Sequence, residues 1–117
     1  MDIQAVQRTI EGFVRQRDWE VYHTPKNVAT ALSVEVSELL ENFQWLHNPS
    51  PQEIYNDGDL YRRVKEETAD TMIYLLRFAD ILNIDIASEV ERKLKLNEEK
   101  YPAERSRGEF RKYSRQD

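Results

Sequence analysis

Residues 68–82 read TADTMIYLLRFADIL, and this stretch decides the fold class. It is long enough for about four turns of helix, and its residues are apolar almost all the way round the helix axis. Only Asp70, Arg77 and Asp80 interrupt the apolar surface. A helix of this kind is buried on most sides, which in a small chain favours a further contact with another subunit.

Helical periodicity extends outward from this stretch over most of the chain, and no convincing alternating strand pattern appears. Thr24, followed by Pro25, is a candidate N-cap, and Asp59 and Asp85 are two more. A loop or short helical turn is expected over residues 50–58. The sequence therefore predicts an all-α, four-helix-bundle-like architecture. The four helices are expected at about 3–17, 24–46, 60–82 and 85–100.

The composition limits the possible chemistry. The chain has 117 residues, of which 39% are hydrophobic and 33% charged, so one ordinary core is expected. The lack of cysteine excludes disulfides and thiolate sites, and three widely separated glycines exclude a glycine-rich phosphate loop. Without an apolar run of membrane-spanning length or a signal-peptide core, we expect a cytoplasmic protein with no membrane partner. A net charge of −5 argues against polymeric nucleic acid as a partner.

A change of composition near the C-terminus suggests two parts, a helical domain over residues 1–104 and a basic tail over residues 105–117. The tail holds five basic residues against two acidic ones. Two interpretations stay open at this point: a solvated terminus, or a flap that brings cations to an anionic ligand.

Two of the expected helices carry acidic residues three apart beside an apolar stripe, Glu35 with Glu38 and Glu67 with Asp70. This spacing places each pair on adjacent turns of one face. Carboxylates on a largely buried surface need a compensating cation, and an all-oxygen set suits Mg²⁺ or Mn²⁺. We expect these four acids to face each other across a helix pair and bind Mg²⁺. Ordinary surface charge is the alternative, because this spacing is common in helices.

A di-iron bundle is a competing interpretation, but it requires two E-x-x-H motifs. Only Glu20 and His23 fit the spacing, and they precede Pro25, where the helix is interrupted. Several aromatic residues lie near the acidic pairs in the sequence. They either cap the ends of the bundle as large hydrophobic groups or form a stacking slot for a planar base.

An ordered set of motifs resembles the dCTP pyrophosphatase branch of the MazG-like nucleotide pyrophosphohydrolases over about residues 10–102. In the first half the motifs are Arg17-Asp18-Trp19-Glu20, His23, Pro25, Asn27, Ala31-Leu32, Glu35-Val36-Ser37-Glu38-Leu39 and Phe43-Gln44-Trp45. In the second half they are Glu66-Glu67-Thr68-Ala69-Asp70, Tyr74-Leu75, Lys93, Asn97 and Tyr101-Pro102. The specificity lies in the order of the set, since each piece alone is common.

The resemblance implies an all-α homodimer or homotetramer that hydrolyses a nucleoside triphosphate, dCTP-like, to the monophosphate and pyrophosphate, as a house-cleaning enzyme of the nucleotide pool. It assigns the metal and the catalysis to Glu35, Glu38, Glu67 and Asp70. It also implies substrate binding by Trp19, His23, Trp45 and Tyr74 around the base and sugar, and by Lys93 and Asn97 near the phosphates. A non-catalytic helical protein that binds nucleotide or regulates a partner is the alternative function. Turnover, as opposed to binding alone, separates the two.

Overall fold

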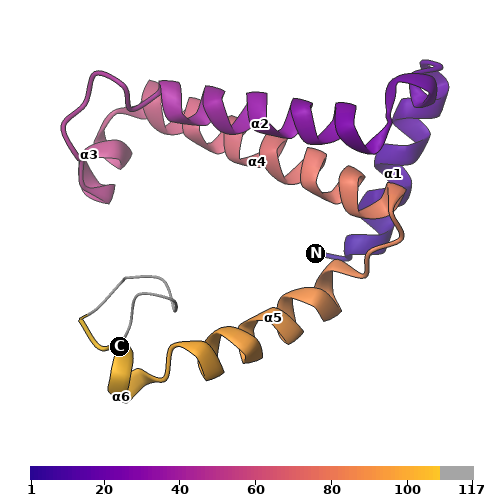
Figure 1. Ribbon diagram of the computed structural model, residues 1–117. Helices are drawn as coiled ribbons and strands as arrows, with labels where there is room; N and C mark the ends of the chain where they lie inside the picture. Colours follow the sequence, from indigo (N-terminus) through magenta and orange to yellow (C-terminus); the bar gives the residue numbers. More distant parts are fainter. Residues whose placement is uncertain (109–117) are drawn as a thin grey trace. The chain divides into compact units, whose positions relative to one another are not determined.

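The computed structural model describes residues 1–108, and every regular element in that range is helical (Figure 1), which confirms the predicted all-α class. The chain divides into two compact units, Met1–Asn83 and Ile84–Asp117. No helix in the described range is long and apolar enough to cross a membrane. The helices are α1 (Ile3–Gln16), the short 3₁₀ helix η1 (Glu20–Tyr22), α2 (Pro25–Glu41), α3 (Pro51–Asn56), α4 (Gly58–Ile81), α5 (Ile86–Lys100) and α6 (Ala103–Ser106).

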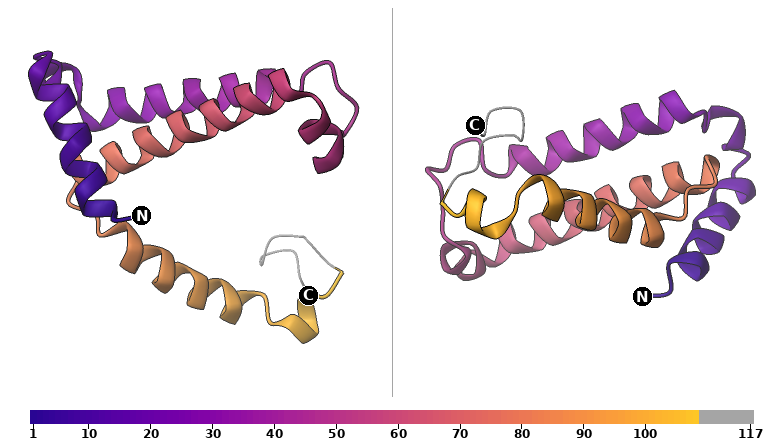
Figure 2. Two further views of the ribbon diagram at one scale, coloured as in Figure 1. Left: turned by 180° about the vertical axis from the view of Figure 1, so that it is seen from behind. Right: turned by 60° about the horizontal axis from the view of Figure 1, so that its bottom comes forward.

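Helices α2 and α4 lie side by side and antiparallel, and they form the body of the first unit (Figures 1 and 2). The start of α2 is as predicted, because Oγ1 of Thr24 accepts a hydrogen bond from the backbone N–H of Asn27. Val28 on α2 and Leu76 on α4 are the most deeply buried large side chains, with 2% and 1% of their surface exposed. Burying a side chain of this size contributes about 1.5–3 kcal/mol.

The start of α4 differs from the sequence-based prediction. The helix begins at Gly58, and Asp57, not Asp59, is its N-cap. Asp57 keeps an extended backbone, and its carboxylate accepts a hydrogen bond from the backbone N–H of Leu60 at 3.1 Å. Asp59 instead lies in the first turn, where it forms ion pairs with Arg62 and Arg63. A negative charge there also interacts favourably with the helix dipole.

The end of α2 also differs, because the helix stops at Glu41 and not near residue 46. The side-chain amide of Asn42 donates to the backbone carbonyl groups of Glu38 and Leu39, at 3.2 and 3.3 Å. An asparagine that bonds locally to the backbone competes with continued helix. The following residues form turns with hydrogen bonds between residues three apart, such as that from Phe43 N to Leu40 O.

Helix α1 crosses one end of the α2–α4 pair, and α3 packs against α4 at the other end (Figures 1 and 2). Arg77 of α4 is 6% exposed and connects three segments. It forms an ion pair with Glu11 of α1, and its Nε donates to Nδ1 of His23, the residue after η1, at 3.0 Å. Burial of the 68–82 stretch is only partial in the single chain, because Met72 and Ile73 remain exposed.

The second unit contains α5 and α6. Asp85 is the N-cap of α5, as predicted, since its carboxylate accepts a hydrogen bond from the backbone N–H of Ser88. Helix α6 occupies residues at the junction between the predicted helical domain, 1–104, and the predicted tail, 105–117. That boundary stays a prediction, because residues 109–117 lie outside the described residues.

Candidate functional site

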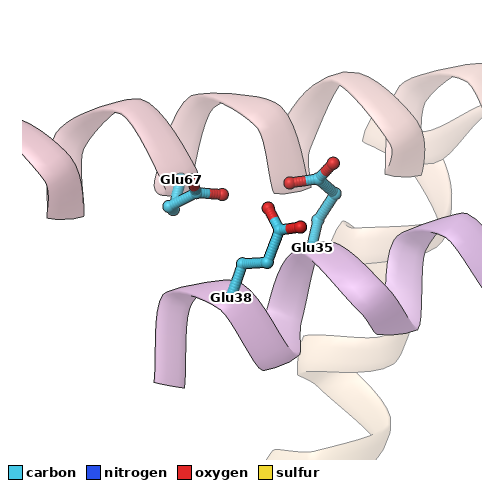
Figure 3. Close-up of side chains that lie close together, drawn as sticks. All are labelled: Glu35, Glu38 and Glu67. Carbon is cyan, nitrogen blue, oxygen red and sulfur yellow. The ribbon is translucent and has the colours of Figure 1, made fainter. Parts of the chain in front are cut away.

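Three glutamate side chains from two helices meet on the α2–α4 pair. Glu35 and Glu38 lie one turn apart on α2, and Glu67 lies on α4. Each offers a carboxylate oxygen that lies within 4.8 Å of the other two. Figure 3 shows the three carboxylates pointing toward one another from the facing surfaces of the two helices. We call these three residues the glutamate cluster.

Two oxygen atoms of the glutamate cluster are buried without a hydrogen-bond partner in the described part of the chain. They are Oε2 of Glu35 and Oε2 of Glu67. A buried polar atom that lacks a partner costs about 1–3 kcal/mol, and more when it is charged. The arrangement is therefore unfavourable unless a proton or a cation is bound, and three converging carboxylates are the donor set that a hard divalent cation prefers. The cluster is suited to hold a metal ion.

The protonation of the cluster reflects the same crowding. Burial, a hydrogen bond with the Glu67 carboxyl group and the negative charge of Glu38 together raise the pKa of Glu35 to about 7. Burial raises the pKa of Glu67 as well. Without a cation, crowding therefore makes full ionisation of Glu35 and Glu67 less favourable than it is for isolated glutamates.

The fourth predicted ligand, Asp70, is not one of the three residues whose oxygens converge. It lies on α4, three residues after Glu67, and its side chain is exposed. Its negative charge nevertheless contributes to the raised pKa values of Glu35 and Glu67. The structure thus brings together three of the four predicted acids and places the fourth within electrostatic range.

An open pocket of about 760 Å³ adjoins the glutamate cluster on the first unit. Its lining combines acidic, basic and aromatic side chains, a mixture that can bind an anionic ligand with a planar group. The lining residues that matter most here are Ser37, Glu38, Asn42, Trp45, Arg63 and Glu67. Trp45 is 88% exposed, so its indole ring is free to stack on a ligand.

The other predicted base-binding residues lie elsewhere in the first unit. Trp19 and His23 precede α2, whereas Trp45 follows it, and a helix of 17 residues is about 25 Å long. A single chain therefore does not bring Trp19 and His23 to the pocket that Trp45 lines. Tyr74 is half-buried on α4, one turn after Asp70. Trp19 packs edge-to-face on Phe13, with the ring centroids 5.8 Å apart.

Comparison with known proteins assigns the family. The family model described as the MazG-like family matches residues 30–115 of the chain.

The chain belongs to the MazG-like family.

Curated relatives named dCTP pyrophosphatase 1, from Rattus norvegicus and from Homo sapiens, are 34% identical to this MazG-like chain over 112 residues, or 96% of it. The chain spans 66% of the length of these relatives, just under two thirds. A crystal structure of a pyrophosphatase from Archaeoglobus fulgidus superposes with a TM-score of 0.77 and 40% sequence identity. That match covers 87% of this chain and 94% of the other. The resemblance seen in the sequence is thereby confirmed.

Two further residues predicted for this MazG-like chain lie on α5. Lys93 and Asn97 are four residues apart, so they lie on adjacent turns of one helix face. They belong to the second unit, whereas the glutamate cluster belongs to the first. Their role near the phosphates stays a prediction from the resemblance.

Arg63 and Asn42 line the pocket, but neither was singled out from the sequence. Arg63 precedes Glu67 by four residues, so spacing alone places the two on one face of α4. That signal was available in the sequence. Asn42 follows Glu38 by four residues, so the same spacing placed it on the face of Glu38.

Proposed function

We propose that this MazG-like protein is a nucleoside triphosphate pyrophosphohydrolase that converts a dCTP-like nucleotide to the monophosphate and pyrophosphate. The observation that carries the proposal is the glutamate cluster, with its two buried oxygens that lack partners, beside a pocket lined by an exposed tryptophan. Relatives named dCTP pyrophosphatase support the same activity and substrate class. We propose that this activity serves house-cleaning of the nucleotide pool in the cytoplasm.

Mg²⁺, with Mn²⁺ as a substitute, is the cofactor that we propose for the site. Glu35, Glu38 and Glu67 would hold it, and Asp70 would complete the carboxylate set. When bound, a divalent cation neutralises charge on the phosphates and lowers the pKa of a water molecule. Mg²⁺ in proteins usually keeps several water molecules, so this carboxylate set would leave room for water and for phosphate oxygens.

The reaction needs no nucleophilic side chain. A water oxygen bonds to the α-phosphorus, the bond from that phosphorus to the bridging oxygen breaks, and pyrophosphate leaves with that oxygen. The proton lost by the water passes to a carboxylate of the acidic set that the cation does not saturate. The remaining contribution of the protein is to position and desolvate the substrate, which dominates catalysis of phosphoryl transfer.

We further propose that the active form is a homodimer or homotetramer. The α2–α4 pair exposes apolar side chains in the single chain, including Val36 and Leu40 on α2 and Ile73 on α4. A second copy would cover this surface. We propose that the second copy also brings its Trp19 and His23 to this pocket, since the length of α2 keeps the residues of one chain from reaching it.

The test is incubation of the protein with dCTP and Mg²⁺, followed by separation of the products. Monophosphate and pyrophosphate are expected, and diphosphate with orthophosphate would contradict the proposal. A panel of natural and modified triphosphates at equal concentration then ranks the substrates, with dUTP as the first comparison. Binding of a non-hydrolysable analogue without turnover of any triphosphate would favour the non-catalytic, regulatory function.

A further inference from the structure

Arg63 holds a defined position between the two chemical ends of the pocket. The side chain of Arg63 on α4 reaches the end of α2, where its Nε donates a hydrogen bond of 3.1 Å to Oδ1 of Asn42. One turn away from this hydrogen-bonded pair lie Glu38 on α2 and Glu67 on α4, both members of the glutamate cluster. Trp45 lies on the other side of Asn42 in the chain and lines the same pocket. Along α2 and the turns that follow it, the order is therefore Glu38, the Asn42–Arg63 pair and Trp45.

The guanidinium group of Arg63 is held in place by other residues. Nε donates to Asn42, whose own amide is fixed by hydrogen bonds to the carbonyl groups of Glu38 and Leu39. Nη1 forms an ion pair with Asp59. Within the described residues, no hydrogen bond involves Nη2, and 45% of the side chain is exposed. A guanidinium that is oriented on one edge and open on another is prepared to bind a phosphate oxygen.

The pocket also needs a cation. Glu38, Glu41 and Glu67 line it, and a polyphosphate cannot approach these carboxylates closely without positive charge to offset the repulsion. A metal ion at the glutamate cluster would supply charge at one end. Arg63 supplies positive charge at another part of the pocket lining.

We propose that Arg63 binds the α-phosphate of the substrate, an inference that rests on the proposed function and on stacking of the base on Trp45. With the base at Trp45 and the metal-bound phosphates at the glutamate cluster, the phosphate attached to the sugar lies at the level of Arg63. Arg63 is thus a substrate-binding residue for the phosphorus at which hydrolysis occurs. The phosphate that it binds remains on the nucleoside monophosphate after the reaction.

The neighbouring Arg62 provides a matched control. It also forms an ion pair with Asp59, and a second with Glu66, and its side chain is 56% exposed. It does not line the pocket described above. Arg62→Gln and Arg63→Gln therefore remove the same charge from adjacent positions on one helix, and each removes one ion pair with Asp59. Arg63→Lys keeps the charge and loses the planar, forked donor.

The experiment measures equilibrium binding of dCMP, pyrophosphate and a non-hydrolysable dCTP analogue to the full chain in Mg²⁺ by calorimetry. A hydrogen bond to a charged group contributes a factor of about 10 to 100 to a binding constant. Arg63→Gln should therefore lower the affinity for dCMP and for the analogue by about that factor. The affinity of Arg63→Gln for pyrophosphate should change by less than about twofold. The affinity of Arg62→Gln should change by less than about twofold for all three ligands. The affinity of Arg63→Lys for dCMP and the analogue should lie between that of the wild type and that of Arg63→Gln. Circular dichroism establishes that each variant is folded.

Unchanged dCMP affinity in both Arg63 variants would overturn the proposal. Equal losses for dCMP and pyrophosphate would also overturn it, because they would indicate general attraction of anions. If the wild type hydrolyses dCTP and Arg63→Gln binds dCMP normally, only the role of Arg63 is wrong. If the wild type binds dCMP through Arg63 but hydrolyses no triphosphate, only the proposed enzymatic activity is wrong. A wild type that binds no nucleotide overturns both.

Discussion

The Nε of Arg77 donates to Nδ1 of His23 at 3.0 Å, although 54 residues separate the two in the chain. Because Nδ1 accepts this bond, the hydrogen of the neutral imidazole lies on Nε2. Burial and the positive charge of Arg77 lower the pKa of His23, so the ring is neutral at pH 7. His23 therefore offers a donor, Nε2–H, to any ligand that reaches it.

Loss of Arg77 should destabilise the fold. Arg77→Leu removes the partner of both Glu11 and His23, and we expect the free energy of unfolding to fall by about 2–4 kcal/mol. Arg15→Gln is the control, since Arg15 pairs with the same glutamate but is exposed. Its loss should cost less than about 1 kcal/mol. Urea denaturation measures both, and similar effects of the two changes would contradict the structural role of Arg77.

The stability of the metal-free protein should depend on pH through Glu35. The pKa of Glu35 in the folded protein is about 7, against an ordinary value of 4.5, so the folded state binds the proton more tightly. The resulting stabilisation is complete below the unfolded pKa and is lost as pH rises through 7. Relative to Glu35→Gln, the wild type should lose about 1–3 kcal/mol between about pH 5 and 8.5. Urea denaturation in EDTA tests this, and a difference that stays constant over the range would refute it.

Binding of Mg²⁺ should stabilise the protein by mass action. We expect the thermal midpoint of the wild type to rise with Mg²⁺ concentration, to return when EDTA is added, and to be nearly insensitive to Mg²⁺ in Glu67→Gln. Glu66→Gln is the matched control, because Glu66 is adjacent, exposed and paired with Arg62. Differential scanning calorimetry provides the measurement. An equal response in Glu66→Gln and Glu67→Gln would place the cation elsewhere.

Catalysis should require both the glutamate cluster and Asp70. Glu38→Gln and Asp70→Asn should each lower kcat/KM by at least about 100-fold, because each removes a carboxylate that would hold the divalent cation, and with that cation the positive charge at the phosphates. Helicity should not change, since neither side chain is deeply buried. Release of pyrophosphate from dCTP is the assay, with Glu66→Gln again as the control. If both variants retain turnover, the acidic set is wrongly assigned.

Mixing two inactive variants tests whether subunits share a site. If Trp19 of one subunit serves the pocket of another, Trp19→Ala mixed with Glu38→Gln should recover about a quarter of wild-type activity, the statistical expectation for a homodimer. Recovery occurs because half of the dimers are mixed, and each mixed dimer has one intact site. Neither variant alone should show it. Absence of recovery after confirmed subunit exchange would show that Trp19 and Glu38 act within one chain.

The sequence allowed the helices and the glutamate cluster to be predicted for the same reason, the 3.6-residue period. Glu35, Glu38 and Glu67 follow from spacing beside an apolar stripe, since a helix fixes the direction of each side chain from its position. Residue type predicts Thr24 and Asp85 as N-caps, and the structure confirms both. Asp57 was not predicted, because Asp59 has the same chemistry and the structure uses it for ion pairs instead.

Two features could not be predicted from the sequence, because local side-chain hydrogen bonds decide one and distances within the fold decide the other. The end of α2 depends on the local hydrogen bonds of Asn42, and residue type alone did not indicate them. The resemblance implies that Trp19, His23, Trp45 and Tyr74 lie around one base and sugar. Within one chain, the length of α2 separates Trp19 and His23 from Trp45. The family motifs alone do not give this separation in space.

The double role of Asn42 links pocket size to helix length. Its amide group stops α2, and its carbonyl oxygen anchors Arg63. A substitution that let α2 run on by one turn would swing Trp45 away from the mouth of the pocket and release the arginine at the same time. A replacement at this single amino acid would therefore change both the turn that carries the indole ring and the orientation of the guanidinium group.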